Sequence, residues 1–216
     1  MIPISPFLLG LLLLLVATSF YAFNNTGVFN QLKFNIASVK QGEYYRLITA
    51  GFIHVDRQHL LFNGFTLYFF GDTTLHGLGI FNFSILYLFS LLAGNLFANY
   101  FHRNEPYYSA VGASGAIMGV VYSSILMFPE MKLAFIFLPI PMPAYVFGVG
   151  YLVYTLFGMK RQADTIGHTA HFGGAIGGVV CTLIFNPSVI EKSLFTLVLL
   201  SIVTVVLAFI LFWRKV

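Results

Sequence analysis

Polar side chains with catalytic potential occur in three of the most apolar stretches of this sequence. Ser114 opens one apolar run, His59 and Asn63 lie together in a second, and His171 opens a third. A hydroxyl, an imidazole and side-chain hydrogen-bond donors are the groups that hydrolysis needs as nucleophile, base and oxyanion stabilisers. A lone buried polar residue in a helical bundle more often makes a helix–helix hydrogen bond. The catalytic hypothesis therefore depends on these groups occurring together.

Ser114 lies in a glycine-rich segment that permits close backbone approach. Gly112 and Gly115 flank it, and Gly115 and Gly119 stand four residues apart, which places them on one face of a helix. Taken alone, this pattern is more typical of helix packing than of catalysis. The backbone N–H of Ser114 would lie at a helix N-terminus, where the helix dipole favours negative charge.

His171 heads a second glycine stripe. Gly174 and Gly178 follow it by three and seven residues, so all three share one helix face. Two glycine-lined helices are natural packing partners, and their contact would bring the Ser114 hydroxyl to the imidazole. His168 faces nearly the same way and could touch the base, but we favour a role in satisfying a loop carbonyl.

The third group supplies candidate oxyanion donors. His59 and Asn63 are four residues apart and share one helix face, whereas His54 falls about 140° away from His59 and is expected in the turn before that helix. No acidic residue is placed to orient His171. A Ser114–His171 dyad is therefore more economical than a triad.

Histidines in two pairs also raise the alternative of a zinc site. The H-E-x-x-H pattern of metalloproteases is absent, no carboxylate or thiolate accompanies the histidines, and Asn63 is a poor zinc ligand. We therefore expect neither a metal nor any other cofactor.

The composition is that of an integral membrane protein. Of 216 residues, 58% are hydrophobic and 8% are charged, whereas soluble domains carry roughly 25% charged residues. Mean hydropathy is +0.87. The net charge of +4 does not indicate nucleic-acid binding, because the Lys and Arg residues are scattered singly or in pairs. Cys181 stands alone in an apolar segment and is interpreted as a core residue.

Apolar runs long enough to cross a bilayer predict an all-α, polytopic transmembrane bundle in one domain, residues 1–216. Seven spans are expected, at about Pro6–Phe23, Gln58–Phe70, Gly79–Phe101, Gly112–Phe128, Pro143–Met159, Gly167–Phe185 and Leu194–Trp213. The joint Asn24–Ile53 is too long and aromatic for a simple connector and is expected to pack on the domain or enter the interface. Three prolines predict an irregular stretch over Leu133–Pro143.

If the N-terminus were cytoplasmic, most Lys and Arg residues would lie outside, so the positive-inside rule favours the opposite orientation.

Four motifs together resemble the rhomboid intramembrane serine proteases. They are Glu43-Tyr-Tyr-Arg46, His54-x4-His59-x3-Asn63, Gly112-Ala113-Ser114-Gly115 and Ala170-His171-x2-Gly174-x3-Gly178. They occur in the family's order and cover the chain from about Gln41 to Phe185.

The resemblance implies a six-helix core over about residues 6–186, with an additional helix at about 194–213. It implies catalytic Ser114 and His171, and an oxyanion site formed by His59, Asn63 and the backbone of Ser114, with Gly112 and Ala113 in the same backbone segment. It further implies single-span membrane proteins as substrates, contact with membrane lipid and a water-filled cavity that opens to the non-cytoplasmic side. A bacterial cell membrane is the expected location.

The resemblance also implies structural roles near the site. Glu43 and Arg46 would brace the first loop, and Lys160–Ile166 would be a mobile cap. The family usually has Trp-Arg where this chain has Tyr45-Arg46, an aromatic exchange that should preserve the brace. A Tyr often stands four residues after the catalytic Ser and stacks on the His. Here that position is Met118, which can pack on an imidazole less stiffly.

Two other functions compete with proteolysis. A non-catalytic relative would bind membrane helices through the same grooves and act as a chaperone. A small transporter is motivated by polar residues at membrane depth, but the repeated halves and broken helices typical of transporters are not found in this sequence.

Overall fold

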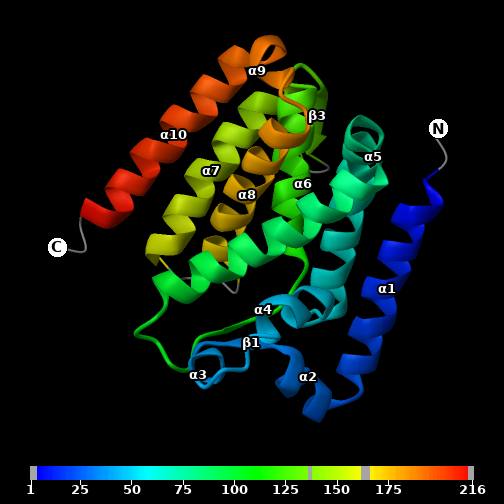
Figure 1. The fold of residues 1–216 in the computed structure, drawn as a ribbon, viewed down its shortest axis with the longest axis vertical. Coiled ribbons are helices and arrows are strands. Elements are labelled where there is room, and N and C mark those ends of the chain that lie inside the picture. Colours follow the sequence, from blue (N-terminus) through cyan, green and yellow to red (C-terminus); the bar gives the residue numbers. More distant parts are fainter. Residues whose placement is uncertain (1–3, 136–137, 162–165, 214–216) are drawn as a thin grey trace.

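The structure, a computed structural model, describes residues 4–135, 138–161 and 166–213. Over these residues the chain forms a helical bundle with two short strand pairs, which confirms the predicted all-α class. The long helices are α1 (Pro6–Phe23), α5 (Arg57–Phe101), α6 (Ser114–Met127), α7 (Ala144–Arg161), α8 (His168–Phe185) and α10 (Leu194–Trp213). In Figure 1, α1 and α10 lie on opposite sides of the bundle, with α6 and α8 between them.

Each predicted span falls on one of these helices. Among the described residues, α1, α5 and α8 are long and apolar enough to cross a membrane. Shorter apolar helices occur at Ser114–Met127, Ala144–Met159 and Leu194–Ile210. Since hydrocarbon offers no partner for backbone N–H and C=O groups, helices that satisfy them internally are the form expected of spanning segments.

Helix α5 contains two of the predicted spans, separated by a bend at Gly79. This glycine has φ 75° and ψ 164°, so the helix changes direction there (Figure 1). The prediction that the second span ends at Phe70 is wrong, because helical structure continues to the bend. Polar residues beyond Phe70 are tolerated because they find partners. The Thr74 hydroxyl, for example, donates to the carbonyl oxygen of Val120 at 3.1 Å.

The joint between α1 and α5 is folded and packs on the bundle. It contains α2 (Thr26–Leu32), β1 (Phe34–Asn35), α3 (Ile36–Lys40), α4 (Arg46–Thr49) and the 3-10 helix η1 (Ala50–Phe52). Strand β1 pairs antiparallel with β2 (Ser109–Ala110), which shortly precedes α6. Phe34 and Ile36 are fully buried. Their burial attaches the joint to the segment that leads to Ser114.

Arg46 connects several parts of this joint. Its buried guanidinium donates to the Glu43 carboxylate at 2.5 Å. It also donates to the carbonyl oxygens of Asn30 and Lys33, at 2.7 and 2.8 Å. Charge-assisted bonds of this kind are stronger than neutral ones. They hold the end of α2 and the chain before β1 against the start of α4.

The proline-rich segment after α6 forms a β-hairpin, so the expected irregular stretch is wrong. β3 (Lys132–Phe135) pairs antiparallel with β4 (Leu138–Pro143), with an irregular register between Leu133 and Phe135. The prolines of β4 alternate along the strand, so their missing N–H donors all face one side. A two-stranded sheet accommodates them because each strand has an outer edge.

Helices α5, α6 and α8 pack closely through small residues and form the centre of the bundle. A Cβ added to Gly94 of α5 would lie 2.5 Å from the carbonyl oxygen of Ala170 in α8. One added to Gly119 of α6 would lie 2.0 Å from the Ser90 hydroxyl of α5. Because these spaces exclude even a methyl group, the three helices have little freedom to separate or slide. Helix α10 follows the short α9 (Val189–Lys192) and packs mainly on α7.

Candidate active site

The glycine stripes of α6 and α8 face each other beside Ser114 and His171. A Cβ added to Gly174 would lie 2.0 Å from the carbonyl oxygen of Gly115, and one added to Gly178 would lie 2.3 Å from that of Gly119. One turn earlier on α8, the carbonyl oxygen of Ala170 lies 3.4 Å from a Cβ built on Gly115. The starts of α6 and α8, which carry Ser114 and His171, therefore lie close together.

Ser114 is the first residue of α6 and is partly exposed. The preceding residue, Ala113, is the helix cap and provides no side-chain hydrogen bond. Gly112 has φ +121°, a conformation that favours glycine, and its N–H donates to the carbonyl oxygen of Ala50 at 2.9 Å. The chain thus turns sharply before Ser114. The first-turn N–H groups, left without a side-chain cap, point out of the helix end.

His59 contacts this turn directly. A Cβ built on Gly112 would lie 2.6 Å from Cε1 and 2.9 Å from Nε2 of the His59 ring. Asp56 caps α5, since its carboxylate accepts from the backbone N–H of His59 at 2.7 Å. This cap fixes the helix start and places the imidazole against the backbone that precedes Ser114.

Asn63 is one turn further along α5 and is buried. Within the described part of the chain, its Nδ2 has no hydrogen-bond partner. A buried amide donor without an acceptor is costly in a resting protein. A side-chain donor that stabilises a transient oxyanion would likewise have no acceptor before substrate binds.

His54 lies in the turn before α5 and is fully buried. Its Nδ1 is 2.9 Å from the Ser19 hydroxyl of α1, and its Nε2 accepts from the backbone N–H of Ala113 at 3.4 Å. Burial, with a smaller contribution from the nearby His59, lowers the pKa of His54 to about 3, while Asp56 opposes the shift. His54 is therefore a neutral link between α1 and the backbone before Ser114, a contact that its expected place in the turn did not reveal.

The imidazole of His171 is buried and meets a side chain that the sequence analysis missed. The Tyr151 hydroxyl oxygen of α7 lies 2.8 Å from Nδ1 of His171, and the two rings stack with centroids 6.1 Å apart. An aromatic residue of α7 thus stacks on His171, whereas Met118 is a buried residue of α6. No hydrogen bond joins Ser114 to His171 among the described residues, so the dyad remains a prediction. Catalytic hydrogen bonds are often long in resting enzymes and shorten when substrate binds.

His168 lies on the α7 side of His171. A Cβ built on Gly158 would be 2.1 Å from Nε2 of His168, and the Tyr154 ring packs edge-on at 5.2 Å. The centroids of the His168 and His171 rings are 6.3 Å apart.

Among the described residues, no three His, Cys, Asp or Glu side chains form a group that could hold a metal ion. The predicted cap at Lys160–Ile166 lies largely outside the described residues.

A cavity of about 400 Å³ adjoins the candidate site. Its lining includes His59, the segment Tyr108–Val111, and Ile166 and Gly167 before α8. Among the candidate site residues, His59 lines this cavity, whereas Ser114 and His171 do not.

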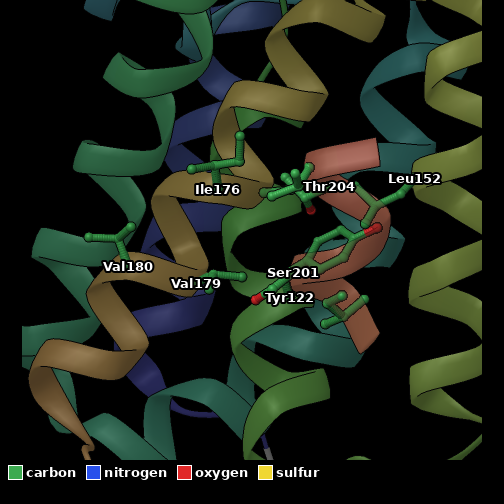
Figure 2. Close-up of a pocket in the computed structure, with 10 residues that line it drawn as sticks. Tyr122, Leu152, Ile176, Val179, Val180, Ser201 and Thr204 are labelled. Atoms are coloured by element: carbon green, nitrogen blue, oxygen red, sulfur yellow. The ribbon is translucent and has the colours of Figure 1, made fainter. Parts of the chain in front are cut away.

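A second cavity, of about 210 Å³, lies between α8 and α10 (Figure 2). Its wall is mostly aliphatic, with Ser201 and Thr204 of α10 as its polar members and Tyr122 of α6 at one side. None of the candidate catalytic residues lines it. It is therefore separate from the site formed by α5, α6 and α8.

Apolar helices of spanning length, packed through glycines around buried histidines, define a polytopic integral membrane protein. Comparison with known proteins specifies the class further. The model of the Rhomboid domain matches residues 41–188, and the chain belongs to the rhomboid family. The match includes the polar groups of α5, α6 and α8 and ends before α10.

Curated relatives are similar over the same region. RHOMBOID-like protein 12, mitochondrial, from Arabidopsis thaliana is 28% identical over 168 residues, which cover 71% of this chain and 50% of the relative. Rhomboid protein 1, mitochondrial, from Saccharomyces cerevisiae is 31% identical over 137 residues, or 62% of this chain and 40% of the relative. Rhomboid protease GluP from Bacillus subtilis is 30% identical over 142 residues, or 65% of this chain and 26% of the relative.

The chain thus spans half or less of the length of these relatives. The plant and yeast relatives are mitochondrial by name. The expectation of a bacterial cell membrane is therefore not supported, while a location in a membrane is.

Proposed function

We propose that this protein is an intramembrane serine endopeptidase that cleaves peptide bonds in or beside the transmembrane helices of single-span membrane proteins. The observation that carries the proposal is the close backbone approach of Gly174 to Gly115, where an added Cβ would lie 2.0 Å from the Gly115 carbonyl oxygen, because it brings together the helix starts that bear Ser114 and His171. Membership of the rhomboid family supports the same class of activity, and one relative is a protease by name.

In the proposed reaction, Nε2 of His171 takes the proton of the Ser114 hydroxyl as the serine oxygen attacks the substrate carbonyl carbon. Collapse of the tetrahedral intermediate releases the amine product, which receives this proton from His171. The acyl group remains on Ser114 as an ester. Water then attacks the ester, with His171 again as the base, and free serine is restored.

The negative charge of the tetrahedral oxygen is assigned to three donors. They are the backbone N–H of Ser114 at the start of α6, the ring N–H of His59 and the amide of Asn63. The unpartnered Nδ2 of Asn63 and the contact of His59 with Gly112 support this assignment. Donors that are already fixed before the reaction stabilise developing charge without reorganisation.

The test is cleavage of a single-span substrate by the full chain reconstituted in lipid vesicles. Ser114→Ala and His171→Ala should each abolish cleavage. Ser84→Ala is the matched control, since among the described residues the hydroxyl of the partly buried Ser84 donates only within α5, to the carbonyl oxygen of Ile80. Activity should also persist in a strong chelator, because no step uses a metal. Undiminished cleavage by Ser114→Ala would refute the proposal.

A non-catalytic relative that binds membrane helices predicts a different result in the same vesicles. It would retain association with the substrate, leave the substrate intact in wild type and all variants, and show no dependence on Ser114. Wild-type cleavage that requires Ser114 excludes this alternative.

A further inference from the structure

Tyr151 contacts Nδ1 of His171, the ring nitrogen that the proposed reaction does not use. Its hydroxyl oxygen lies 2.8 Å from Nδ1, and its ring stacks on the imidazole at an interplanar angle of 30°. His171 is buried, and Tyr151 is partly buried. The pair joins α7 to α8 at the level of the candidate site.

The two ring nitrogens of histidine are not equivalent, and the partner of one decides the protonation of the other. For Nε2 to accept a proton from Ser114, the neutral imidazole must carry its hydrogen on Nδ1. The Tyr151 oxygen can accept that Nδ1–H, and the same bond persists when Nε2 becomes protonated. In serine hydrolases of other folds a carboxylate has this role.

We propose that Tyr151 is a positioning residue for His171, whose hydroxyl holds the imidazole in the Nδ1–H tautomer and directs Nε2 toward Ser114. This inference rests on the proposed function, because only a proteolytic His171 needs a fixed tautomer. Tyr151 acts through His171 and has no contact with the reacting atoms.

The packing around the Tyr151 ring should keep the ring in place when its hydroxyl is removed, so the effect of the hydroxyl can be measured by itself. The ring stacks on Phe147 at 6.0 Å and contacts Tyr154 at 5.8 Å. Three residues before it, Gly148 accepts a hydrogen bond at 2.6 Å from the Tyr122 hydroxyl of α6. Because this bond and the ring contacts hold α7 in place, Tyr151→Phe should remove one hydrogen bond while the ring stays in position.

The experiment compares Tyr151→Phe with Tyr122→Phe in the reconstituted full chain. Both variants remove a tyrosine hydroxyl from the contacts of α7, but only the first contacts His171. We expect Tyr151→Phe to lower kcat by about tenfold, the typical value of one buried neutral hydrogen bond, with KM unchanged. The rate of reaction with a fluorophosphonate should fall in proportion, since it depends on the same base. Tyr122→Phe should change both rates by less than about twofold, although the two variants lower the melting temperature by similar amounts.

A wild-type kcat in Tyr151→Phe overturns the inference. Equal losses in Tyr122→Phe and Tyr151→Phe also overturn it, because they would show that the hydroxyls only stabilise the bundle. Ser114→Ala, measured in parallel, distinguishes the two proposals. Loss of cleavage in Ser114→Ala with normal kcat in Tyr151→Phe removes the positioning role alone, whereas full cleavage by Ser114→Ala removes the protease assignment and this inference with it.

Discussion

Gly174 of α8 contacts Gly115 of α6 so closely that an added Cβ would lie 2.0 Å from the Gly115 carbonyl oxygen. Real Cβ atoms do not approach other atoms to this distance, and the atom in the way belongs to the backbone. The two helices can therefore keep their separation only while position 174 has no side chain. Because Ser114 precedes Gly115 and His171 lies one turn before Gly174, the same contact sets the distance between the proposed nucleophile and base.

Gly174→Ala should therefore impair stability and activity together. We expect overpacking to cost about 1–3 kcal/mol of unfolding free energy and to lower kcat more than a loss of folded protein explains. Gly10→Ala is the control, because nothing lies within 4 Å of a Cβ at Gly10 in α1. Melting temperature in detergent and the cleavage rate per folded molecule measure the two effects. Normal cleavage by folded Gly174→Ala would contradict the role given to this contact.

Asn63→Ala should lower activity strongly while changing stability little. Its Nδ2 has no partner among the described residues, so removing the amide group breaks no hydrogen bond of that nitrogen and should change the unfolding free energy by less than about 1 kcal/mol. Loss of one oxyanion donor typically lowers kcat by about 10²–10³. Thermal melting and single-turnover cleavage test the two parts. A variant that unfolds readily yet cleaves normally when folded would make Asn63 a structural residue.

The lowered pKa of His54 should make the unfolding free energy depend on pH. Its pKa is about 3 in the folded protein and 6.5 in the reference state, mainly because of burial. Below pH 6.5 the unfolded chain therefore binds a proton that the folded chain does not, and unfolding free energy decreases as pH falls toward 3. The slope for this one group is at most about 1.4 kcal/mol per pH unit.

His54→Gln should remove that slope while keeping a polar group between Ser19 and Ala113. Melting temperatures of wild type and variant, measured from pH 7.5 to pH 4.5, should converge at low pH. Parallel curves would show that His54 does not titrate as its burial requires.

The sequence predicted most of the fold because hydrophobic length decides where helices cross a membrane. The expected start of the third span, Gly79, is the residue at which α5 bends. The end of the second span was misplaced because residues such as Thr74 are polar by type yet bonded inside the bundle. The hairpin after α6 was missed because proline content alone does not distinguish an irregular segment from a strand whose prolines all face one side.

The candidate site was predictable only where a motif placed its residues on one helix. The glycine spacings after Ser114 and His171 predicted facing stripes, and the structure brings Gly115 and Gly174 into contact. Tyr151 was missed because α7 has no polar motif and an aromatic residue in an apolar helix is usually a packing residue. Its approach to His171 depends on how α7 docks, which no local pattern in the sequence encodes.

The central claim is that the hydroxyl of Ser114 is a nucleophile activated by His171. The most direct measurement is reaction of the reconstituted protein with a fluorophosphonate, followed by mass spectrometry of its peptides. The account predicts one phosphonyl adduct, on Ser114, that is lost in Ser114→Ala, strongly reduced in His171→Ala and retained in Ser84→Ala. An unmodified Ser114 in protein that cleaves its substrate, or an adduct on another serine, would contradict it.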